Sequence, residues 1–283
     1  MSAAAAPMQG EFHLSDGDYE TIARMAHAHA GIMLGTGKRQ LVYSRLAKQV
    51  RRRGMADFAD YVALLRNDAD ARREAIFALT TNHTKFFRED HHFTHFAEHV
   101  RPDLLARSER GTPVRLWSAA CSSGEEPYTL AMTLLGEDRA GGGRIAQRDI
   151  AILATDLAPH VIATAKAGRY PAEMARDIPD RFRRTWVKPV GDEIAMAPEL
   201  QRVIAYKHLN LLESWPMRGR FDVIFCRNVM IYFDEPTKAR LLERFAGLIP
   251  AGGYMYIGHS ERLIGPAATM FDSVGHTIYR RRG

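Results

Sequence analysis

The stretch WSAACSSGEEPYTLAM (residues 117–132) decides the fold class, because its pattern is that of a turn from a buried strand into a helix. Nucleotide-binding α/β proteins have a GxGxG loop at this turn, where bare backbone N–H groups approach a diphosphate. Here Ala120 and Ser122 occupy two of the three glycine positions, Gly124 is retained, and Glu125 and Glu126 begin the helix. Carboxylates repel a diphosphate, so the loop favours a cofactor whose nearest group is cationic.

S-Adenosylmethionine (SAM) meets this requirement, since it has an ammonium and a sulfonium group and no phosphate. Without a diphosphate to approach, Ala120 and Ser122 suffice, and we expect Gly124 alone to meet the tight turn. The acids also have a purely structural interpretation, because carboxylates stabilise the first turn of a helix. The loop by itself leaves both interpretations open, and Glu126 is assigned only the structural one. A nicotinamide dehydrogenase is the least favoured class.

Downstream of residue 112, apolar strands alternate with helices. This pattern predicts an α/β domain with a Rossmann-like, mostly parallel, doubly wound sheet that is covered on both faces. Prolines and a glycine interrupt the pattern between residues 178 and 208, where we expect a small antiparallel β-insertion. The predicted strands are 114–120, 149–156, 221–228, 254–260 and 276–282.

The first 80 residues have helical periodicity, with Asp16 as the expected N-cap of the first helix. Within this region, residues 36–53 contain seven Lys and Arg and no Asp or Glu, so this segment accounts for the whole net charge of +6. Val42, Leu46 and Val50 form an apolar stripe along one side of the helix predicted there. The cations on its other faces are either a solvated surface or a docking surface for an acidic partner.

The composition indicates a soluble, cytoplasmic protein. The chain starts without the basic and apolar regions of a signal peptide, and it contains no apolar run of about 18 residues that would span a membrane. Cys121 and Cys226 lie 105 positions apart, which is not a zinc-ligand spacing. His91, His95 and His99 share a helix face, but carboxylates at ligand spacing are lacking beyond Glu98, so we expect no metal.

Polar residues at the strand ends are the candidate ligand-binding residues, because ligands of doubly wound sheets bind beyond the carboxyl ends of the strands. Asp156 ends the second strand and is either a ribose ligand or a helix N-cap. Arg227 and Asn228 interrupt an apolar run, and burying them unsatisfied would cost roughly 1–3 kcal/mol each. The Tyr232 hydroxyl either faces the same cleft or packs in the core.

Five segments in this order resemble the CheR family of chemotaxis-receptor glutamate methyltransferases over about residues 14–280. They are NHTKFFRE, RLWSAACSSGEEPYTLAM, ATDLAPHVIATAKAGRY, FDVIFCRNVMIYFD and GHSE. The resemblance implies a tail over residues 1–13, an N-terminal all-helical receptor-docking domain over 14–80 and a linker helix over 81–100. It also implies a SAM-binding α/β domain over 101–283, with the β-subdomain inserted at about 178–208.

The resemblance assigns roles residue by residue. Glu125 would bind the methionyl ammonium and Asp156 the ribose, while Arg88 and Tyr232 would act at the reacting centre. The further SAM-binding residues implied are Asn82, Thr84, Asn210, Leu211, Arg227 and Asn228, together with Arg88. The implied docking residues for the acidic helices of the receptor are Arg45, Lys48, Arg51, Arg52 and Arg53.

The implied reaction converts a receptor glutamate into its γ-methyl ester and SAM into S-adenosylhomocysteine, without a metal. Family members that bind a receptor's C-terminal pentapeptide have a longer loop with Gly-x-Gly in the β-subdomain. The loop here is about three residues shorter and lacks the Gly-x-Gly, so we expect an enzyme that acts independently of the pentapeptide. We also expect a monomer. Two alternatives are a nucleic-acid methyltransferase that uses the basic helix, and a non-catalytic signalling module. The first lacks the [DNS]PP[YF] tetrapeptide, and the second would not need every site position filled.

Overall fold

The computed structural model describes residues 11–80 and 83–283 and divides the chain into two compact units, Met1–Thr81 and Asn82–Gly283. Asn82, which the sequence analysis assigned to SAM, lies outside the described residues. Over the described residues no helix is long and apolar enough to cross a membrane.

The first unit is all-helical over residues 11–80. Its first helix is capped by Ser15, whose hydroxyl accepts the Asp18 N–H while the Asp18 carboxylate accepts from Ser15. The predicted N-cap Asp16 instead occupies the first turn. The elements are α1 (Asp16–Ala30), η1 (Thr36–Lys38), α2 (Arg39–Arg52), α3 (Phe58–Asn67) and α4 (Ala69–Leu79).

The apolar stripe predicted for α2 is confirmed, because Val42, Leu46 and Val50 are completely buried. Phe58 and Tyr61 of α3 are buried as well. The cations of α2 therefore lie on faces that the core leaves available, as expected for an amphipathic helix.

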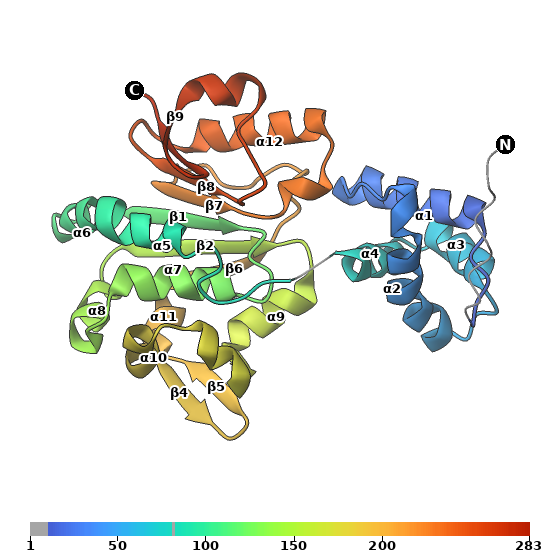
Figure 1. Ribbon diagram of the computed structural model, residues 1–283, viewed down its shortest axis with the longest axis horizontal. Coiled ribbons are helices and arrows are strands. Elements are labelled where there is room, and N and C mark those ends of the chain that lie inside the picture. Colours follow the sequence, from blue (N-terminus) through green and yellow to red (C-terminus); the bar gives the residue numbers. More distant parts are fainter. Residues whose placement is uncertain (1–10, 81–82) are drawn as a thin grey trace. The chain divides into compact units, whose positions relative to one another are not determined.

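The second unit contains a mixed, mostly parallel sheet of seven strands over residues 83–283, in the order β6-β2-β1-β7-β8-β10-β9 (Figure 1). The five strands from β6 to β8 pair in parallel, and β10 and β9 add antiparallel strands at one edge. The strands are β1 (Val114–Ala119), β2 (Ile150–Asp156), β6 (Ile204–His208), β7 (Val223–Cys226), β8 (Tyr254–Ile257), β9 (Phe271–Gly275) and β10 (Ile278–Arg281).

Each central strand contributes side chains to two separate cores. Val223 and Phe225 of β7 belong to the core that includes α7 (Glu125–Leu135), whereas Ile224 and Cys226 belong to the core that includes α12 (Glu235–Leu248). These two helices cover opposite faces of the sheet (Figure 1). This alternation explains why the strand is apolar throughout. The helices and helical turns are α5 (His91–His95), η2 (Phe96–Val100), α6 (Arg101–Glu109), α7 (Glu125–Leu135), α8 (Arg139–Ile145), α9 (Pro159–Ala167), η3 (Ala172–Asp177), α10 (Asp180–Trp186), α11 (Pro198–Val203), η4 (Met230–Tyr232), α12 (Glu235–Leu248) and η5 (Gly265–Met270).

A small antiparallel sheet, β3-β5-β4, is formed by β3 (Arg169–Pro171), β4 (Val187–Val190) and β5 (Glu193–Met196). It differs from the expected insertion in two respects: β3 precedes residue 178, and β6 pairs with β2 of the large sheet. The linker also differs from expectation, since residues 83–90 are coil and turns and the helix begins at His91.

The loop between β1 and α7 keeps the backbone of a glycine loop with fewer glycines. Ala120, Ser122 and Gly124 all have positive φ, at 63°, 49° and 100°. The expectation that Gly124 alone would meet the turn is therefore wrong. Two residues with side chains adopt a conformation that costs roughly 1–2 kcal/mol each.

Gly124 is the position of this loop that cannot accept a side chain. A Cβ there would lie 2.7 Å from the Ala165 Cβ and 2.8 Å from the Tyr170 hydroxyl. We predict that Gly124→Ala lowers the free energy of unfolding by at least about 1–2 kcal/mol, measured by denaturant titration. The control is Gly143→Ala in α8, which has no atom within 4 Å of the new Cβ and should raise stability by about 0.4–1 kcal/mol. Equal stabilities of the two variants would contradict the prediction.

Candidate functional site

The strand order reverses between β1 and β7, so the loops that follow these two central strands meet at the edge of the sheet formed by the carboxyl ends of its parallel strands. Such a switch point is where doubly wound sheets bind ligands. The stretch after β1 provides Glu125 and Glu126, and the stretch after β7 provides Arg227 and Asn228. Residues that are about one hundred positions apart in the sequence are thereby brought into contact.

Arg227 is the charged centre of this edge. Its side chain is 2% exposed, and its Nη1 donates to Glu126 Oε2 at 2.9 Å. Its Nη2 lies 3.2 Å from Glu89 Oε2 and donates to the backbone carbonyl of Arg88. The guanidinium also lies over the Phe93 ring, 5.5 Å from its centroid. A buried cation is stable only with such partners, so Arg227 binds three segments together.

Glu89 and Glu126 are the site residues that the sequence analysis missed. Glu126, assigned there only to the helix turn, binds Arg227 and also accepts the Ser118 hydroxyl at 2.7 Å. Glu89 accepts from Asn228 Nδ2 at 3.1 Å and contacts His259 Nδ1 at 3.0 Å. Burial raises the pKa of Glu89. The opposing effect of Arg227, Asn228 and His259 is larger, so the pKa falls to about 2. The residue is therefore ionised at neutral pH.

Glu125 contrasts with its neighbour. The residue is 3% exposed, and its carboxylate accepts the Ser123 hydroxyl at 2.8 and 3.0 Å. Burial raises its pKa against the effect of these hydrogen bonds. Over residues 11–80 and 83–283 it forms no ion pair. A buried carboxylate without a cation is costly, and a cationic ligand group would remove that cost.

Asp156 ties the end of β2 to the first loop. Its Oδ2 accepts the Ser122 N–H at 2.8 Å and its Oδ1 accepts the Ala158 N–H at 3.0 Å. Burial raises its pKa, and the backbone hydrogen bonds oppose that rise. The N-cap of α9 is Ala158, so the N-cap alternative for Asp156 is wrong. Each oxygen keeps a lone pair with which it can accept a ligand hydroxyl.

The remaining predicted residues of the second unit come from three other segments, namely the linker before α5, the stretch after β6 and the turn η4. Asn210 follows β6 and accepts the Leu212 N–H at 3.0 Å, and Leu211 is buried in the core on the α12 face. Thr84 and Arg88 are half-buried, and Arg88 donates to the His83 carbonyl at 2.7 Å. The Tyr232 ring packs partly buried against the same α12-side core, in the turn η4.

A third buried acid, Glu261, joins the loops after β7 and β8. Its carboxylate accepts backbone N–H groups from Gly258 at 2.6 Å, Met230 at 2.8 Å and Asn228 at 3.1 Å. Burial raises its pKa. A Cβ at position 258 would lie 2.5 Å from Asn228 Nδ2, so the two loops approach as closely as they do because residue 258 is glycine. In the sequence, Glu261 is marked only as the last residue of the GHSE segment.

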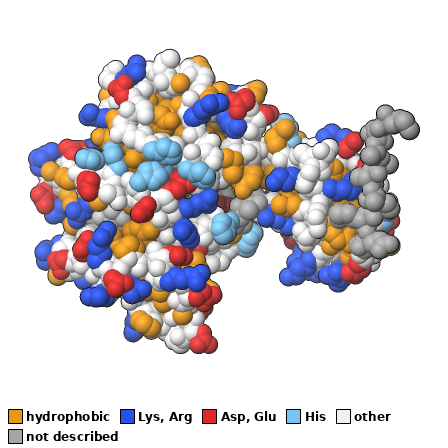
Figure 2. Space-filling view, in the orientation of Figure 1, with side chains coloured by type: hydrophobic (Ala, Val, Ile, Leu, Met, Phe, Trp, Pro, Cys, Tyr) orange, Lys and Arg blue, Asp and Glu red, His pale blue; other side chains and the backbone are white. Residues whose placement is uncertain are grey.

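Histidine side chains gather on one face of the second unit (Figure 2). His91 contacts His276 and His95 contacts His99 through their rings. His92 is completely buried, and burial lowers its pKa to about 3. Over the residues that the structure describes, no group of three His, Cys, Asp or Glu is arranged to hold a metal ion.

The basic segment in the first unit has acidic partners from other elements. Arg51 pairs with Glu11, while Arg52 and Arg53 lie 2.9 and 2.8 Å from Glu74. Arg45 donates to the carbonyl groups of Leu79 and Thr80 at the end of α4. Lys48 is exposed. Exposed pairs of this kind are weak, at about 0–1 kcal/mol, so the arginines can exchange partners.

The low pKa of Glu89 predicts a pH-dependent contribution to stability. Because the pKa falls from 4.5 to about 2 on folding, the ionised group stabilises the fold above pH 4.5, and this effect is lost as the pH falls towards 2. Glu89→Gln should therefore lower the free energy of unfolding at neutral pH by roughly 1–3 kcal/mol. This gap between the wild type and the variant should become smaller as the pH falls towards 2.

Denaturant unfolding at several pH values measures this gap. Glu109→Gln is the control, since Glu109 is 62% exposed in its pair with Arg148 and the change should cost less than about 0.5 kcal/mol. A Glu89→Gln gap of constant size from neutral pH to pH 3 would contradict the assigned ion pair.

Comparison with known proteins gives a family match for each of the two units. A family model described as "CheR methyltransferase, SAM binding domain" matches residues 82–280, and one described as "CheR methyltransferase, all-alpha domain" matches residues 17–80. A probable chemotaxis protein methyltransferase of Rhizobium etli is 46% identical over 262 residues, covering 90% of this chain and 96% of that protein. Chemotaxis protein methyltransferase 2 of Pseudomonas aeruginosa is 39% identical, covering 95% and 94%. A solved SAM-dependent methyltransferase from Mesorhizobium loti is 15% identical with a TM-score of 0.31, covering 57% of this chain and 54% of that one.

Proposed function

The chain belongs to the CheR methyltransferase family, and from this membership we propose that it transfers a methyl group from SAM to glutamate side chains of chemotaxis receptors. The products are a glutamate γ-methyl ester and S-adenosylhomocysteine. The second unit is a SAM-binding domain by its family match. The observation that supports the proposal most directly is the buried Glu125 carboxylate, which lacks a cation among the described residues at the switch point of the sheet.

The charges at this point fit SAM. Arg227 pairs with both Glu126 and Glu89, while Asp156 and Glu261 are bound by backbone N–H groups. Glu125 is left to bind the ammonium of the methionine part, and Asp156 to accept from the ribose hydroxyls. Residues proposed to complete the site are Asn82, Thr84, Arg88, Asn210, Leu211, Arg227 and Asn228.

When bound, SAM supplies a methyl group on a positively charged sulfur and leaves as a neutral thioether. The acceptor carboxylate has an ordinary pKa of about 4.3, so it is an ionised nucleophile at neutral pH and no general base is required. The protein has to align the carboxylate with the methyl group and exclude water from it. We assign this to Arg88 by charge and to Tyr232 by its hydroxyl group.

Two substitutions should separate cofactor binding from methyl transfer. Glu125→Gln removes the charge that pairs with the ammonium, so SAM affinity measured by calorimetry should fall roughly 10-fold, corresponding to about 1.4 kcal/mol. Tyr232→Phe should lower kcat at saturating SAM and leave SAM affinity unchanged. Each variant is the control for the other. An unchanged kcat in Tyr232→Phe would remove Tyr232 from the mechanism, and unchanged binding in Glu125→Gln would remove Glu125 from the cofactor site.

We propose the exposed side of α2 as the receptor-docking surface. Lys48 is available there, and Arg51, Arg52 and Arg53 can exchange their weak pairs with Glu11 and Glu74 for acidic side chains of a receptor helix. Arg45 is the least available, because it binds the end of α4. We further propose that the enzyme acts in the cytoplasm as a monomer, without pentapeptide binding and without a nucleic-acid partner.

The nature of the methylated product tests the function. Tritiated methyl groups should pass from SAM to receptor-containing membranes, and a mild base wash should release them as methanol, because a carboxyl ester is hydrolysed by base. Membranes without receptor are the control. Label that survives the wash would exclude a glutamate ester and favour an amine or nucleic-acid acceptor.

A further inference from the structure

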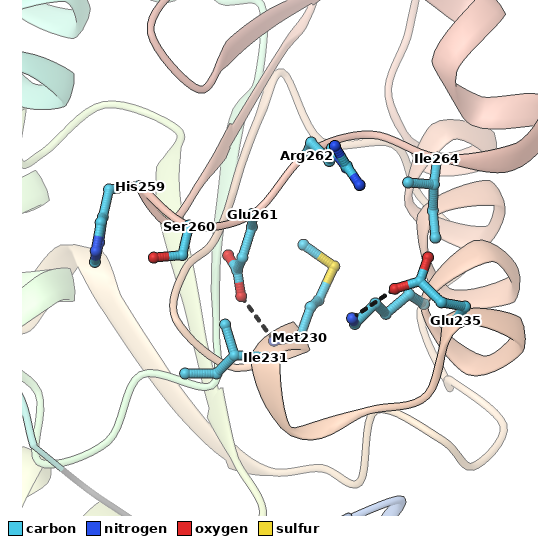
Figure 3. Close-up of a pocket in the computed structure, with 9 residues that line it drawn as sticks. Met230, Ile231, Glu235, His259, Ser260, Glu261, Arg262 and Ile264 are labelled. Atoms are coloured by element: carbon cyan, nitrogen blue, oxygen red, sulfur yellow. Dashed lines mark hydrogen bonds and ion pairs between the residues drawn. The ribbon is translucent and has the colours of Figure 1, made fainter.

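A pocket of about 390 Å³ lies beside the turn that holds Tyr232 (Figure 3). It is bounded by η4, the start of α12 and the loop after β8. None of its lining residues belongs to the proposed SAM-binding set. The lining residues are Met230, Ile231, Glu235, Lys238, His259, Ser260, Glu261, Arg262 and Ile264.

The charges of this pocket leave one cation without a partner. Glu261 is bound by backbone N–H groups, one of them the Met230 N–H drawn in Figure 3. Lys238 Nζ lies 2.9 Å from Glu235 Oε1, and His259 contacts Glu89. Arg262 is exposed, and over residues 11–80 and 83–283 no carboxylate pairs with it. The pocket thus presents a cation that has no carboxylate partner among the described residues.

Apolar side chains accompany that charge. Ile231 is 50% exposed, which is unusual for a large aliphatic residue of this fold, and it is the residue immediately before Tyr232. Ile264 lies on the other side of the pocket, and Met230 is buried beneath (Figure 3). An occupant that matches this lining has a carboxylate next to an aliphatic surface.

We propose that this pocket binds an acidic side chain of the acceptor protein, close in the acceptor to the glutamate that is methylated, with Arg262 as its ionic partner. The inference rests on the proposed function. On a helix, side chains three or four positions apart are about 5–6 Å apart, so an acceptor glutamate at Tyr232 would carry a neighbouring residue to the adjacent pocket. The planar guanidinium of Arg262 is suited to a bidentate pair with a carboxylate.

Steady-state kinetics with receptor-containing membranes tests this subsite. Arg262→Glu should raise the receptor KM roughly 10-fold, because an attraction is replaced by a repulsion, and leave kcat and SAM affinity unchanged. The control is Arg110→Glu, the same charge change at an exposed arginine that precedes β1, at the opposite end of the strands. It should leave the receptor KM unchanged. Higher salt should reduce the difference between wild type and Arg262→Glu.

A charge swap identifies the partner. Receptor variants with lysine in place of single acidic residues three or four positions from the methylated glutamate are assayed with both enzymes. At one such position, lysine should raise KM for the wild type and lower it for Arg262→Glu. Equal receptor KM values for Arg262→Glu and wild type, or a loss confined to SAM affinity, would overturn the subsite. Failure of the wild-type enzyme to form any base-labile product would instead overturn the proposed function.

Discussion

The second unit depends on one buried cation. The Arg227 guanidinium, 2% exposed, has lost its hydration, and a charge in that position is tolerated only if several oxygen atoms replace the water. Those atoms come from Glu126 at the start of α7, from Glu89 in the linker and from the Arg88 carbonyl. The requirement to satisfy Arg227 therefore fixes the helix start, the linker and the end of β7 relative to one another within this unit.

The same requirement distributes the acids around the switch point. Glu126 and Glu89 both pair with Arg227, and Asp156 and Glu261 are held by backbone N–H groups. Glu125 remains without a cation among the described residues. Similar carboxylates thus differ in function through their partners. Glu126, Glu89 and the two backbone-bound acids position the loops. Glu125 retains the charge that a cationic cofactor group can use.

The sequence was sufficient for features that depend on neighbours in the chain. Strand–helix alternation predicted the fold, and polar residues in the apolar run at Arg227 and Asn228 predicted a site. The sequence was insufficient to predict which side chains contact each other in the site, because the Arg227–Glu126 and Asn228–Glu89 contacts join residues 101 and 139 positions apart. It also failed for the backbone of Ala120 and Ser122, whose positive φ values are adopted without the glycines that normally indicate them. Asp156 does not cap α9, whose N-cap is Ala158; its carboxylate accepts the N–H groups of Ser122 and Ala158.

Charge density along the chain is likewise a poor guide to which cations bind a partner protein, because the residues that pair with each cation can be distant in the sequence. The seven cations of residues 36–53 dominate the net charge, yet Arg51, Arg52 and Arg53 are paired with Glu11 and Glu74 from outside that segment. Arg262 has no unusual sequence context, yet it faces a pocket whose carboxylates are already satisfied. The free energy available to an incoming acid depends on the partners a cation already has, since exchanging one pair for another gains little. Under the two proposals, docking through α2 would therefore determine where the acceptor binds, and Arg262, in the pocket next to η4, would determine which of its glutamates is presented.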